Sequence, residues 1–350
     1  MYSPPYTITN KILKYIGTIE ACKEIIDHAP LLPYYEKKFQ DDALVRMVHY
    51  GTHIEGNELD LSQAEKVVMG QQVIARERDI QEVINYRKVI EEIEDFRSQE
   101  PGFKIDEVFI KKLHKMTVAK ILPEETTGVY RKTQVVIKNN QTGDVVFRPP
   151  LPLAVGYQIA DLLAFIQSSE SKEIHPVLLS GVVHYEFVRI HPFVDGNGRV
   201  ARALSTLILF LSGYDIRKFF SLEEYFDSDS GRYYESLQSV EKDNGELTQW
   251  LEYFTEGLSI ELAKVKERVE NVSADIHIKE RLGGKPLMLT ERQMKIIEYV
   301  RKMGYLQNQA FKTLFPMVSE DAVLLDIKTL VGAGLIKKHG VTKGAKYIMS

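Results

Sequence analysis

The sequence has little cysteine and no long apolar run, and both shortages narrow what the protein can be. Cys22 is the single cysteine in 350 residues, so neither an internal disulfide nor a zinc cluster of several thiolates can form. The most apolar stretch, residues 203–211, is far shorter than the roughly 20 residues that span a bilayer. Residues 1–10 lack the basic-then-apolar order of a signal peptide. We therefore expect a cytoplasmic protein that does not enter a membrane.

Charge of one sign is also scarce. The formal net charge is −4, which gives the whole molecule no electrostatic attraction for nucleic acid or anionic lipid. Hydrophobic residues at 44% and charged residues at 27% are typical of a folded globular protein. No His, Asp and Glu residues have the spacing of a zinc protease. We expect the isolated His53, His114 and His184 to be packing residues rather than metal ligands.

What is abundant is helical periodicity. Apolar residues recur at helical spacing, with charges between them, in most of the chain. This pattern predicts helices over residues 41–55, 79–98, 107–122, 153–168, 174–190 and 246–268. The sequence therefore predicts a mostly α-helical protein.

One segment departs from this pattern. Residues 134–137 (QVVI) and 144–147 (DVVF) are β-branched runs on either side of NNQTG, which predicts a β-hairpin. A lone hairpin leaves an edge strand open, to which an extended peptide can add. The alternative is a surface hairpin without a binding role.

The last part of the chain has a different organisation. We expect a linker at 271–288, a helix at 290–303 with Thr290 as its N-cap, a helix at 319–332 and a β-wing at 335–349. This order predicts a winged helix-turn-helix domain over 289–350. That domain carries ten basic and five acidic residues, but three of the acids fall in the helix that would enter a DNA groove. A protein-interaction or homodimer role is therefore favoured over DNA binding.

Residues 191–202, HPFVDGNGRVAR, combine the residue types of a phosphate site with a general base. Pro192 ends the preceding apolar helix and places His191 at the mouth of a loop. Imidazole titrates near neutrality, so this side chain can take a proton from an attacking hydroxyl. The amides of residues 196–198 can form an anion-binding nest at the start of the next helix.

A carboxylate and two arginines complete this segment. Arg199 and Arg202 lie in the first turns of the helix that follows this loop. A cation is unfavourable at the start of a helix unless an anion offsets it. Asp195 supplies a hard oxygen beside that anion, which suits Mg²⁺ bridging phosphates. A connecting turn without function would explain two glycines but not the whole string.

This string matches the signature of the Fic domain family, HPFx(D/E)GN(G/K)RxxR, at every specified position. The resemblance extends back through residues 128–137 (GVYRKTQVVI), which are similar to the Fic flap, and forward to 232–237 (RYYESL), similar to a tyrosine pair near the nucleotide. It covers about residues 41–265. It implies a Fic-type helical bundle with a hairpin flap, followed by the winged helix. The implied division is an N-terminal helical region at 1–100, a catalytic core at 101–270, the linker, and the C-terminal domain.

The resemblance implies a protein adenylyltransferase, which transfers AMP from ATP to a Tyr, Thr or Ser hydroxyl of a target protein. His191 would be the base and Asp195 the Mg²⁺ ligand. Arg199 and Arg202 would bind the β- and γ-phosphates, and the target would dock along the flap at 134–147. The nucleotide-binding residues implied are Asp195, Gly196, Asn197, Gly198, Arg199, Arg202, Ile137, Lys138, Asn139, Asn140, Tyr233 and Tyr234. Among them, Asn197 would fix the α-phosphate and the tyrosines would lie near the adenosine.

Residues 52–57 (THIEGN), within the helical segment at 41–57, resemble the inhibitory helix of Fic proteins, whose pattern is (S/T)xxxE(G/N). Glu55 would pair with Arg202 and occupy the γ-phosphate position. The pattern expects a hydroxyl residue at position 51, where this chain has Gly51 and places Thr52 one residue late.

Two other functions remain open from the sequence. The same fold can remove AMP from a protein, or use another nucleotide or a phosphate donor. A protein of another class, a DNA-binding regulator, would use the Fic site as a nucleotide sensor.

Overall fold

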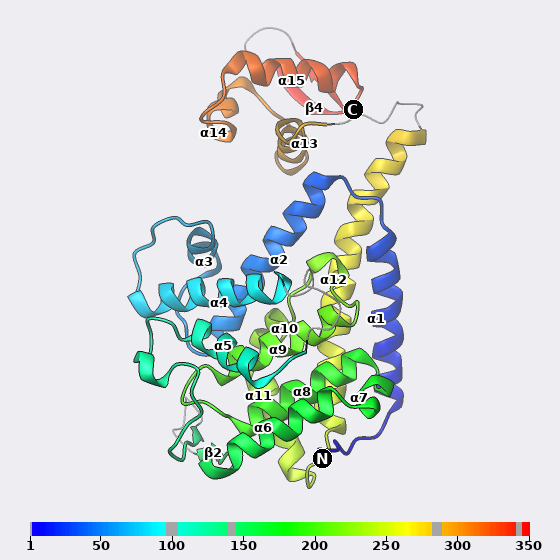
Figure 1. Cartoon of the computed structure of the whole chain (residues 1–350). Helices are drawn as coiled ribbons and strands as arrows, with labels where there is room; N and C mark the ends of the chain where they lie inside the picture. The colour runs from blue at the N-terminus through cyan, green and yellow to red at the C-terminus, as the bar shows by residue number, and fades with distance from the viewer. Residues whose placement is uncertain (1, 96–103, 139–144, 282–288, 341–344) are drawn as a thin grey trace. The chain divides into compact units, whose positions relative to one another are not determined.

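The computed structural model describes residues 2–95, 104–138, 145–281, 289–340 and 345–350, and it confirms the predicted mostly helical fold. The chain divides into two compact units (Figure 1). The first consists of Met1–Ala29 and Lys38–Val269, and the second of Pro30–Lys37 and Glu270–Ser350. None of the helices in the described ranges is both long and apolar enough to cross a membrane.

In the described ranges, twelve α-helices precede the C-terminal elements. They are α1 (Asn10–His28), α2 (Pro33–His53), α3 (Leu61–Val68), α4 (Glu77–Asp95), α5 (Glu107–Thr117), α6 (Pro152–Ile166), α7 (Ser169–Glu173), α8 (Pro176–Ile190), α9 (Asn197–Leu211), α10 (Leu222–Ser228), α11 (Ser230–Lys242) and α12 (Thr248–Arg281). The predicted helix at 107–122 is too long, because α5 ends at Thr117 and Lys120 takes a left-handed backbone conformation. Helix α12 continues to Arg281, through most of the segment at 271–288 that was predicted as a linker.

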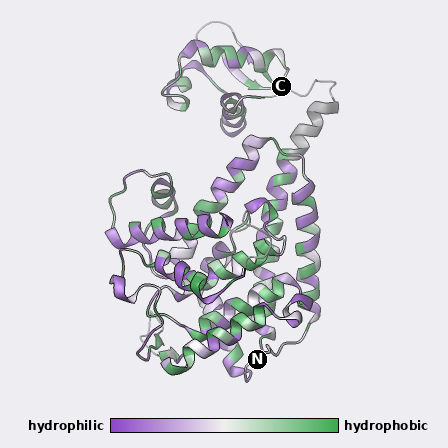
Figure 2. Cartoon of the chain, viewed as in Figure 1, coloured by the Kyte–Doolittle hydropathy of each residue, from purple (hydrophilic) through white to green (hydrophobic). Residues whose placement is uncertain are grey.

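The antiparallel pair α8 and α9 forms the centre of the first unit, and almost every residue of α9 is buried. Figure 2 shows α6 and α8 as largely hydrophobic helices; most of α8 is buried, whereas α6 buries one face. The indole of Trp250 on α12 is fully buried and donates a hydrogen bond to the Gly181 carbonyl of α8 at 2.8 Å. Along another side α1 runs beside α12, joined by hydrogen bonds such as Thr9 to Glu252 (Figure 1). The central helix pair is thus held on several sides.

The predicted hairpin is present but shorter than the sequence indicates. Strands β1 (Ile137–Lys138) and β2 (Val145–Phe147) pair antiparallel, with Ile137 opposite Phe147 and a register shift beside it. Residues 134–136 lie outside the strand, and Gln134 instead donates to the Pro149 carbonyl at 2.8 Å. Residues 139–144 fall outside the described ranges.

The second unit has the predicted order of elements. After α13 (Glu291–Met303) come η4 (Asn308–Ala310), α14 (Phe311–Leu314), α15 (Glu320–Gly332), and the antiparallel strands β3 (Ile336–His339) and β4 (Lys346–Met349). Thr290 is the N-cap of α13, as predicted, and it forms a capping box with Gln293. The unit has a core of its own, which includes Ile297, Leu306 and Ile327. Its assignment as a winged helix stays a prediction.

Candidate functional site

The loop between α8 and α9 is shaped by two residues with left-handed backbones. His191 ends α8 with φ 49° and ψ 61°, and its amide still bonds to the Phe187 carbonyl at 3.0 Å. Gly196 precedes α9 with φ 74°, a conformation that glycine adopts without steric cost. A side chain there would also press on Val118 and Thr117 of the neighbouring segment. The sequence therefore turns the chain sharply at both ends of the loop.

Buried polar side chains hold this loop in place. Arg131 donates to the carbonyls of His191 at 2.8 Å and Pro150 at 2.6 Å, while its own amide donates to Pro192 at 2.9 Å. The Asn197 side chain bonds to both the amide and the carbonyl of Phe193, at 2.9 and 3.0 Å. The side-chain amide of Asn197 is therefore committed to the loop, which leaves its backbone N–H as the group available to a phosphate.

His114 of α5 supports the loop from outside. Its ring stacks on Phe193 with centroids 3.7 Å apart, and it accepts a hydrogen bond from the Gly128 amide at Nδ1. Its Nε2 must therefore carry the proton that it donates to the Asp195 carbonyl at 3.1 Å. Burial lowers the pKa of His114 to about 4, so the ring stays neutral in this role. His114 thus packs against the loop, in agreement with the prediction of a packing residue.

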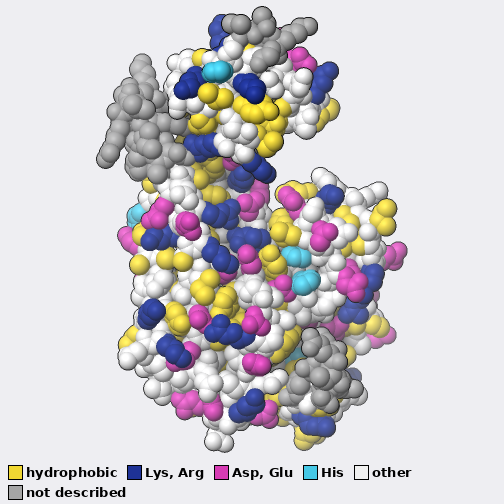
Figure 3. Space-filling model, turned by 180° about the vertical axis from the view of Figure 1, so that it is seen from behind, with side chains coloured by type: hydrophobic (Ala, Val, Ile, Leu, Met, Phe, Trp, Pro, Cys, Tyr) yellow, Lys and Arg dark blue, Asp and Glu magenta, His cyan; other side chains and the backbone are white. Residues whose placement is uncertain are grey.

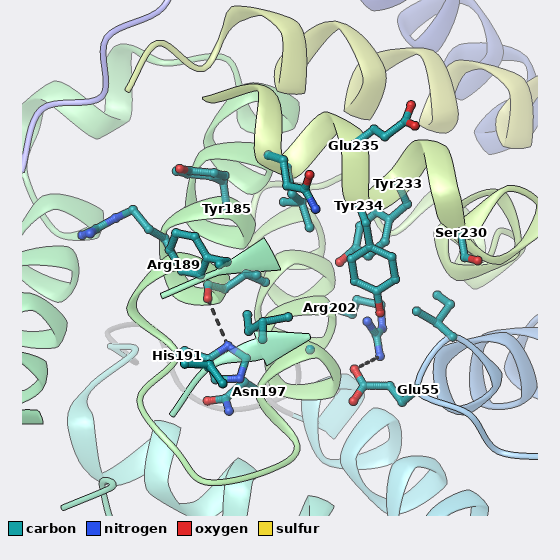
Figure 4. Close-up of a pocket in the computed structure, with 18 of the residues that line it drawn as sticks. Glu55, Tyr185, Arg189, His191, Asn197, Arg202, Ser230, Tyr233, Tyr234 and Glu235 are labelled. Carbon is teal, nitrogen blue, oxygen red and sulfur yellow. Dashed lines mark hydrogen bonds and ion pairs between the residues drawn. The ribbon is translucent and has the colours of Figure 1, made fainter. Parts of the chain in front are cut away.

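The imidazole of His191 is oriented as a base. Its Nδ1 lies 3.2 Å from the Val188 carbonyl, and a carbonyl can only accept, so Nδ1 carries the proton (Figure 4). The other nitrogen, Nε2, is then free to accept a proton. Burial lowers the pKa of His191 below its ordinary 6.5, which keeps the ring neutral at pH 7. The residue lines a cavity of about 640 Å³.

The N-terminus of α9 opens into the same cavity. Gly196, Asn197 and Gly198 line it, and no side chain in the described ranges caps this helix end. The first amides of a helix lack partners within the helix and attract anions. Arg202, which is buried in the first turns of α9, also lines the cavity, whereas the buried Arg199 is not among the residues that line it. Nε and Nη1 of Arg199 make no hydrogen bond among the described residues, but Nη1 lies 3.5 Å from Glu82 Oε1 and Nε lies 4.0 Å from Glu55 Oε2.

Glu55, in the turn after α2, fills part of this anion site. Its Oε1 lies 2.9 Å from Arg202 Nη2 (Figure 4). Its Oε2 lies 4.0 Å from Arg199 Nε. A Cβ at Gly198 would overlap the Glu55 carboxylate, so the glycine makes room for it. Arg202 also donates to the Gly51 carbonyl at 2.7 Å, one of the last carbonyls of α2. The structure thus brings the predicted inhibitory carboxylate and the predicted phosphate arginine together.

The structure also explains the unexpected glycine at position 51. A Cβ there would overlap the ring of Tyr86, which is fully buried on α4. The hydroxyl of Thr52, one residue later, bonds to the carbonyls of Val48 and His49 at 3.0 Å each. Thr52 therefore stabilises the last turn of α2 while Gly51 lets α4 approach.

We expect Gly51→Ser to lower the free energy of unfolding by about 1–3 kcal/mol, because the added atoms must displace Tyr86 from a close-packed site. Urea denaturation would measure the effect. Gly17→Ser is the matched control, since Gly17 lies inside helix α1 and a Cβ there meets nothing within 4 Å. Equal stability of the two variants would contradict the packing account.

Asp195 lies at the edge of the site and is paired with arginines. Its Oδ2 is 3.0 Å from Arg78 Nη2, and its Oδ1 accepts from the Gly196 amide at 2.6 Å and lies 3.5 Å from Arg199 Nη2. Arg78 and its partner Glu82, both on α4, were missed by the sequence analysis. Nothing in their local sequence marks them, because α4 reaches the site only in the folded chain.

The remaining predicted residues fall in different places. Tyr233 is buried, lines the cavity and shares a hydrogen bond of 2.9 Å with His184, while Tyr234 is partly exposed at the cavity wall. Burial raises the pKa of Tyr233 to about 12. Ile137 lines the cavity on the flap side. Lys138 lies in β1, and the predictions for Asn139 and Asn140 fall outside the described residues.

Comparison with known proteins finds a family match over part of the chain. Residues 104–209 match the model of the Fic/DOC family. Protein adenylyltransferase fic-1 of Caenorhabditis briggsae is 27% identical over 209 residues, which are 59% of this chain and 39% of the relative. Protein adenylyltransferase Fic of Nematostella vectensis is 26% identical over 196 residues, 55% of this chain and 44% of the relative. The matches thus span less than half the length of these curated relatives.

Solved structures show the same fold. A Fic family protein from Desulfovibrio desulfuricans G20 aligns over 100% of this chain and 98% of its own, with a TM-score of 0.70 and 23% identity. Fic-1 from C. elegans aligns over 74% of this chain and 73% of its own, with a TM-score of 0.59 and 21% identity. Residues 104–209 therefore match the Fic/DOC family, and the fold of the chain is that of solved Fic proteins.

Proposed function

We propose that the protein is an adenylyltransferase that moves AMP from ATP to a Tyr, Thr or Ser hydroxyl of a target protein. One observation carries the proposal: a single cavity contains the neutral imidazole of His191, the open N-terminus of α9 and the guanidinium of Arg202. Transfer to a hydroxyl needs a base and an anion site side by side. The names of the relatives, protein adenylyltransferases, support the same activity.

The proposed reaction is one in-line displacement. His191 Nε2 takes the proton of the target hydroxyl as its oxygen bonds to the α-phosphorus of ATP. The bond from this phosphorus to the oxygen that bridges the α- and β-phosphates breaks, and pyrophosphate leaves with the electron pair. Arg199 and Arg202 neutralise the charge that accumulates on the leaving group. Positioning and charge therefore suffice, without a covalent enzyme intermediate.

Asp195 fits the role of a magnesium ligand beside the phosphates. Mg²⁺ prefers hard oxygens and is commonly held by one or two carboxylates together with substrate phosphates and water. Throughout the described ranges, no group of three or more His, Cys, Asp or Glu residues could hold a metal ion alone. A cation shared with the nucleotide agrees with that donor set. When bound, it would neutralise phosphate charge and help to hold the α- and β-phosphates.

We infer that Glu55 keeps the resting enzyme nearly inactive. Its carboxylate pairs with Arg202, which the mechanism requires for the phosphates. An arginine–carboxylate pair is strong where water is excluded, and Arg202 is buried. ATP would then bind with its terminal phosphate displaced from Arg202, and its α-phosphorus would be misaligned with the hydroxyl.

The flap is the proposed docking site of the target. Val136, Ile137 and Phe147 line the cavity that contains His191, so a peptide lying along the hairpin would pass the base. An extended peptide gains main-chain hydrogen bonds when it adds to a strand edge. Figure 3 shows basic and acidic side chains interspersed over one face of the molecule, without one large patch of a single sign on that face. Backbone pairing along the flap needs no such patch.

The test of this function uses ATP labelled at either the α- or the γ-phosphate. Glu55→Gly protein is incubated with each nucleotide and a lysate of the source cells. Label from the α-position is expected on protein, and none from the γ-position. Transfer of the γ-label would show a phosphoryl transferase instead. Competition by unlabelled GTP, CTP and UTP would reveal the nucleotide preference.

A further inference from the structure

Four charged side chains form a closed ring at the edge of the site. Arg78 contacts Asp195 at 3.0 Å and Glu82 at 3.1 Å. Arg199 contacts the same two carboxylates, each at 3.5 Å. The ring holds two positive and two negative charges, so it is neutral as it stands. A divalent cation added at Asp195 would give the ring an excess of positive charge. Movement of one arginine away from the ring would reduce this excess.

The two arginines differ in their freedom to move. The Arg199 side chain is 1% exposed and is enclosed by the first turn of α9, whereas that of Arg78 is 60% exposed in the first turn of α4. Glu82 is nearly buried and is fixed by a 3.0 Å hydrogen bond from the Asn57 side chain. The Nε of Arg78 bonds to Glu82, so its outer nitrogen can leave Asp195 while the tether remains.

The two oxygens of Asp195 also differ. Oδ1 accepts from the Gly196 amide and faces Arg199, which fixes the carboxylate on the loop. Oδ2 accepts its hydrogen bond from Arg78 at 3.0 Å. Oδ2 is therefore the oxygen that a cation would use, and the guanidinium stands where the cation would approach. Two cations on one carboxylate oxygen repel each other.

We propose that Arg78 competes with Mg²⁺ for Oδ2 of Asp195 and thereby sets the Mg²⁺ concentration that the site requires. The inference rests on the proposed function, since the nucleotide supplies the other ligands of the cation. When the metal–nucleotide complex binds, Arg78 Nη2 leaves Asp195 and the side chain stays attached to Glu82. The resting site thus has two separate restraints, Glu55 on the phosphate arginine and Arg78 on the metal ligand.

A different role for Arg78 would be to bind the phosphates directly. In that case its removal would weaken nucleotide binding, whereas removing a competitor strengthens metal binding. The two roles predict opposite changes, so they can be separated without measuring AMP transfer.

The experiment measures Mn²⁺ binding by electron paramagnetic resonance, with a saturating non-hydrolysable ATP analogue (β,γ-imido) and the full chain carrying Glu55→Gly. Arg78→Ala is expected to lower the Kd of Mn²⁺ about two- to fivefold, the range for a half-exposed ion pair. Arg76→Ala is the matched control, since Arg76 is a neighbouring, similarly exposed arginine that pairs with Asp79 and Glu58. Its Kd is expected to equal that of the parent. Adding Asp195→Ala is expected to abolish both the tight Mn²⁺ site and the effect of Arg78→Ala.

An unchanged Mn²⁺ affinity in Arg78→Ala would overturn the inference, as would tight Mn²⁺ binding that survives Asp195→Ala. Weaker binding of the analogue to Arg78→Ala in the absence of metal would assign Arg78 to the phosphates and also overturn it. Absence of AMP transfer would contradict the proposed function. The Mn²⁺ binding results would still decide whether Arg78 competes with the metal. The two proposals therefore fail separately.

Discussion

AMP transfer by the Glu55→Gly variant is expected to exceed that of the wild-type protein by about ten- to a hundredfold. The carboxylate of Glu55 makes a charge-assisted hydrogen bond to the buried Arg202. Such bonds contribute about 1.5–3 kcal/mol, and each 1.4 kcal/mol is tenfold in an equilibrium. Without the carboxylate, the terminal phosphate of ATP meets no competitor at Arg202. Label from α-labelled ATP on a target or on the enzyme itself measures the change.

Glu58→Gly is the control for this substitution. Glu58 follows Glu55 by three residues, is mostly exposed and contacts Arg76 rather than Arg202. The Glu58→Gly variant should transfer AMP at the wild-type rate. The substitution changes the flexibility of this segment, but it leaves the anion site unchanged. Equal transfer by the Glu55→Gly and wild-type proteins would rule out inhibition by Glu55.

Replacing His191 with Ala in the Glu55→Gly background is expected to lower the transfer rate by about 10²–10⁴, the usual contribution of a general base. Its Nε2 is the base available where the hydroxyl must be deprotonated, and the loop otherwise keeps its shape through Arg131 and Asn197. Binding of the ATP analogue, measured by calorimetry, should persist. A variant that transfers AMP at the parent rate would exclude the mechanism.

The left-handed backbone of His191 makes a second variant necessary. Alanine is unfavourable at φ 49°, so His191→Ala could lose activity through strain in the loop. Asparagine tolerates this conformation but cannot act as a base. We therefore expect His191→Asn to be as inactive as His191→Ala while keeping the unfolding midpoint of the parent.

The pH dependence gives an independent readout of the same residue. Burial lowers the pKa of His191, so the ring remains an unprotonated base at a pH below its ordinary 6.5. Transfer by the Glu55→Gly protein should be flat near neutrality and fall on acidification, with a midpoint under 6.5. A midpoint above that value would point to another base.

The sequence was sufficient for the parts of the site that are contiguous in the chain. The proline, glycines and charges of residues 191–202 predict the loop, the helix start and the phosphate arginines, because each depends on local backbone geometry. Helical periodicity predicted most helices for the same reason, although it overran the end of α5. Glu55 was found through a short motif, and its contact with Arg202 agrees with that prediction.

The remaining parts of the site depend on contacts between segments that are distant in the chain, and the sequence did not predict these contacts. Arg78 and Glu82 lie more than a hundred residues from Asp195, and nothing in their own segment distinguishes them from other surface charges. Arg131 was part of the resemblance, but its hydrogen bonds to the loop carbonyls appear only in three dimensions. Likewise the glycine at position 51 reads as a departure from the family pattern until Tyr86 is placed against it.

The bonds from Arg131 and Asn197 to the loop have a consequence for how the enzyme is switched on. They belong to the polypeptide itself, so the loop is already assembled while Glu55 occupies Arg202. The proposed inhibition then acts by occupancy of Arg202 and not by distortion of the loop. Release of Glu55 would leave the loop between α8 and α9 in its present shape, so this part of the site needs no refolding step and no entropy cost of ordering it. A trigger would have to supply the free energy of breaking the Glu55–Arg202 ion pair, and the metal–nucleotide complex would displace Arg78 from Asp195 separately.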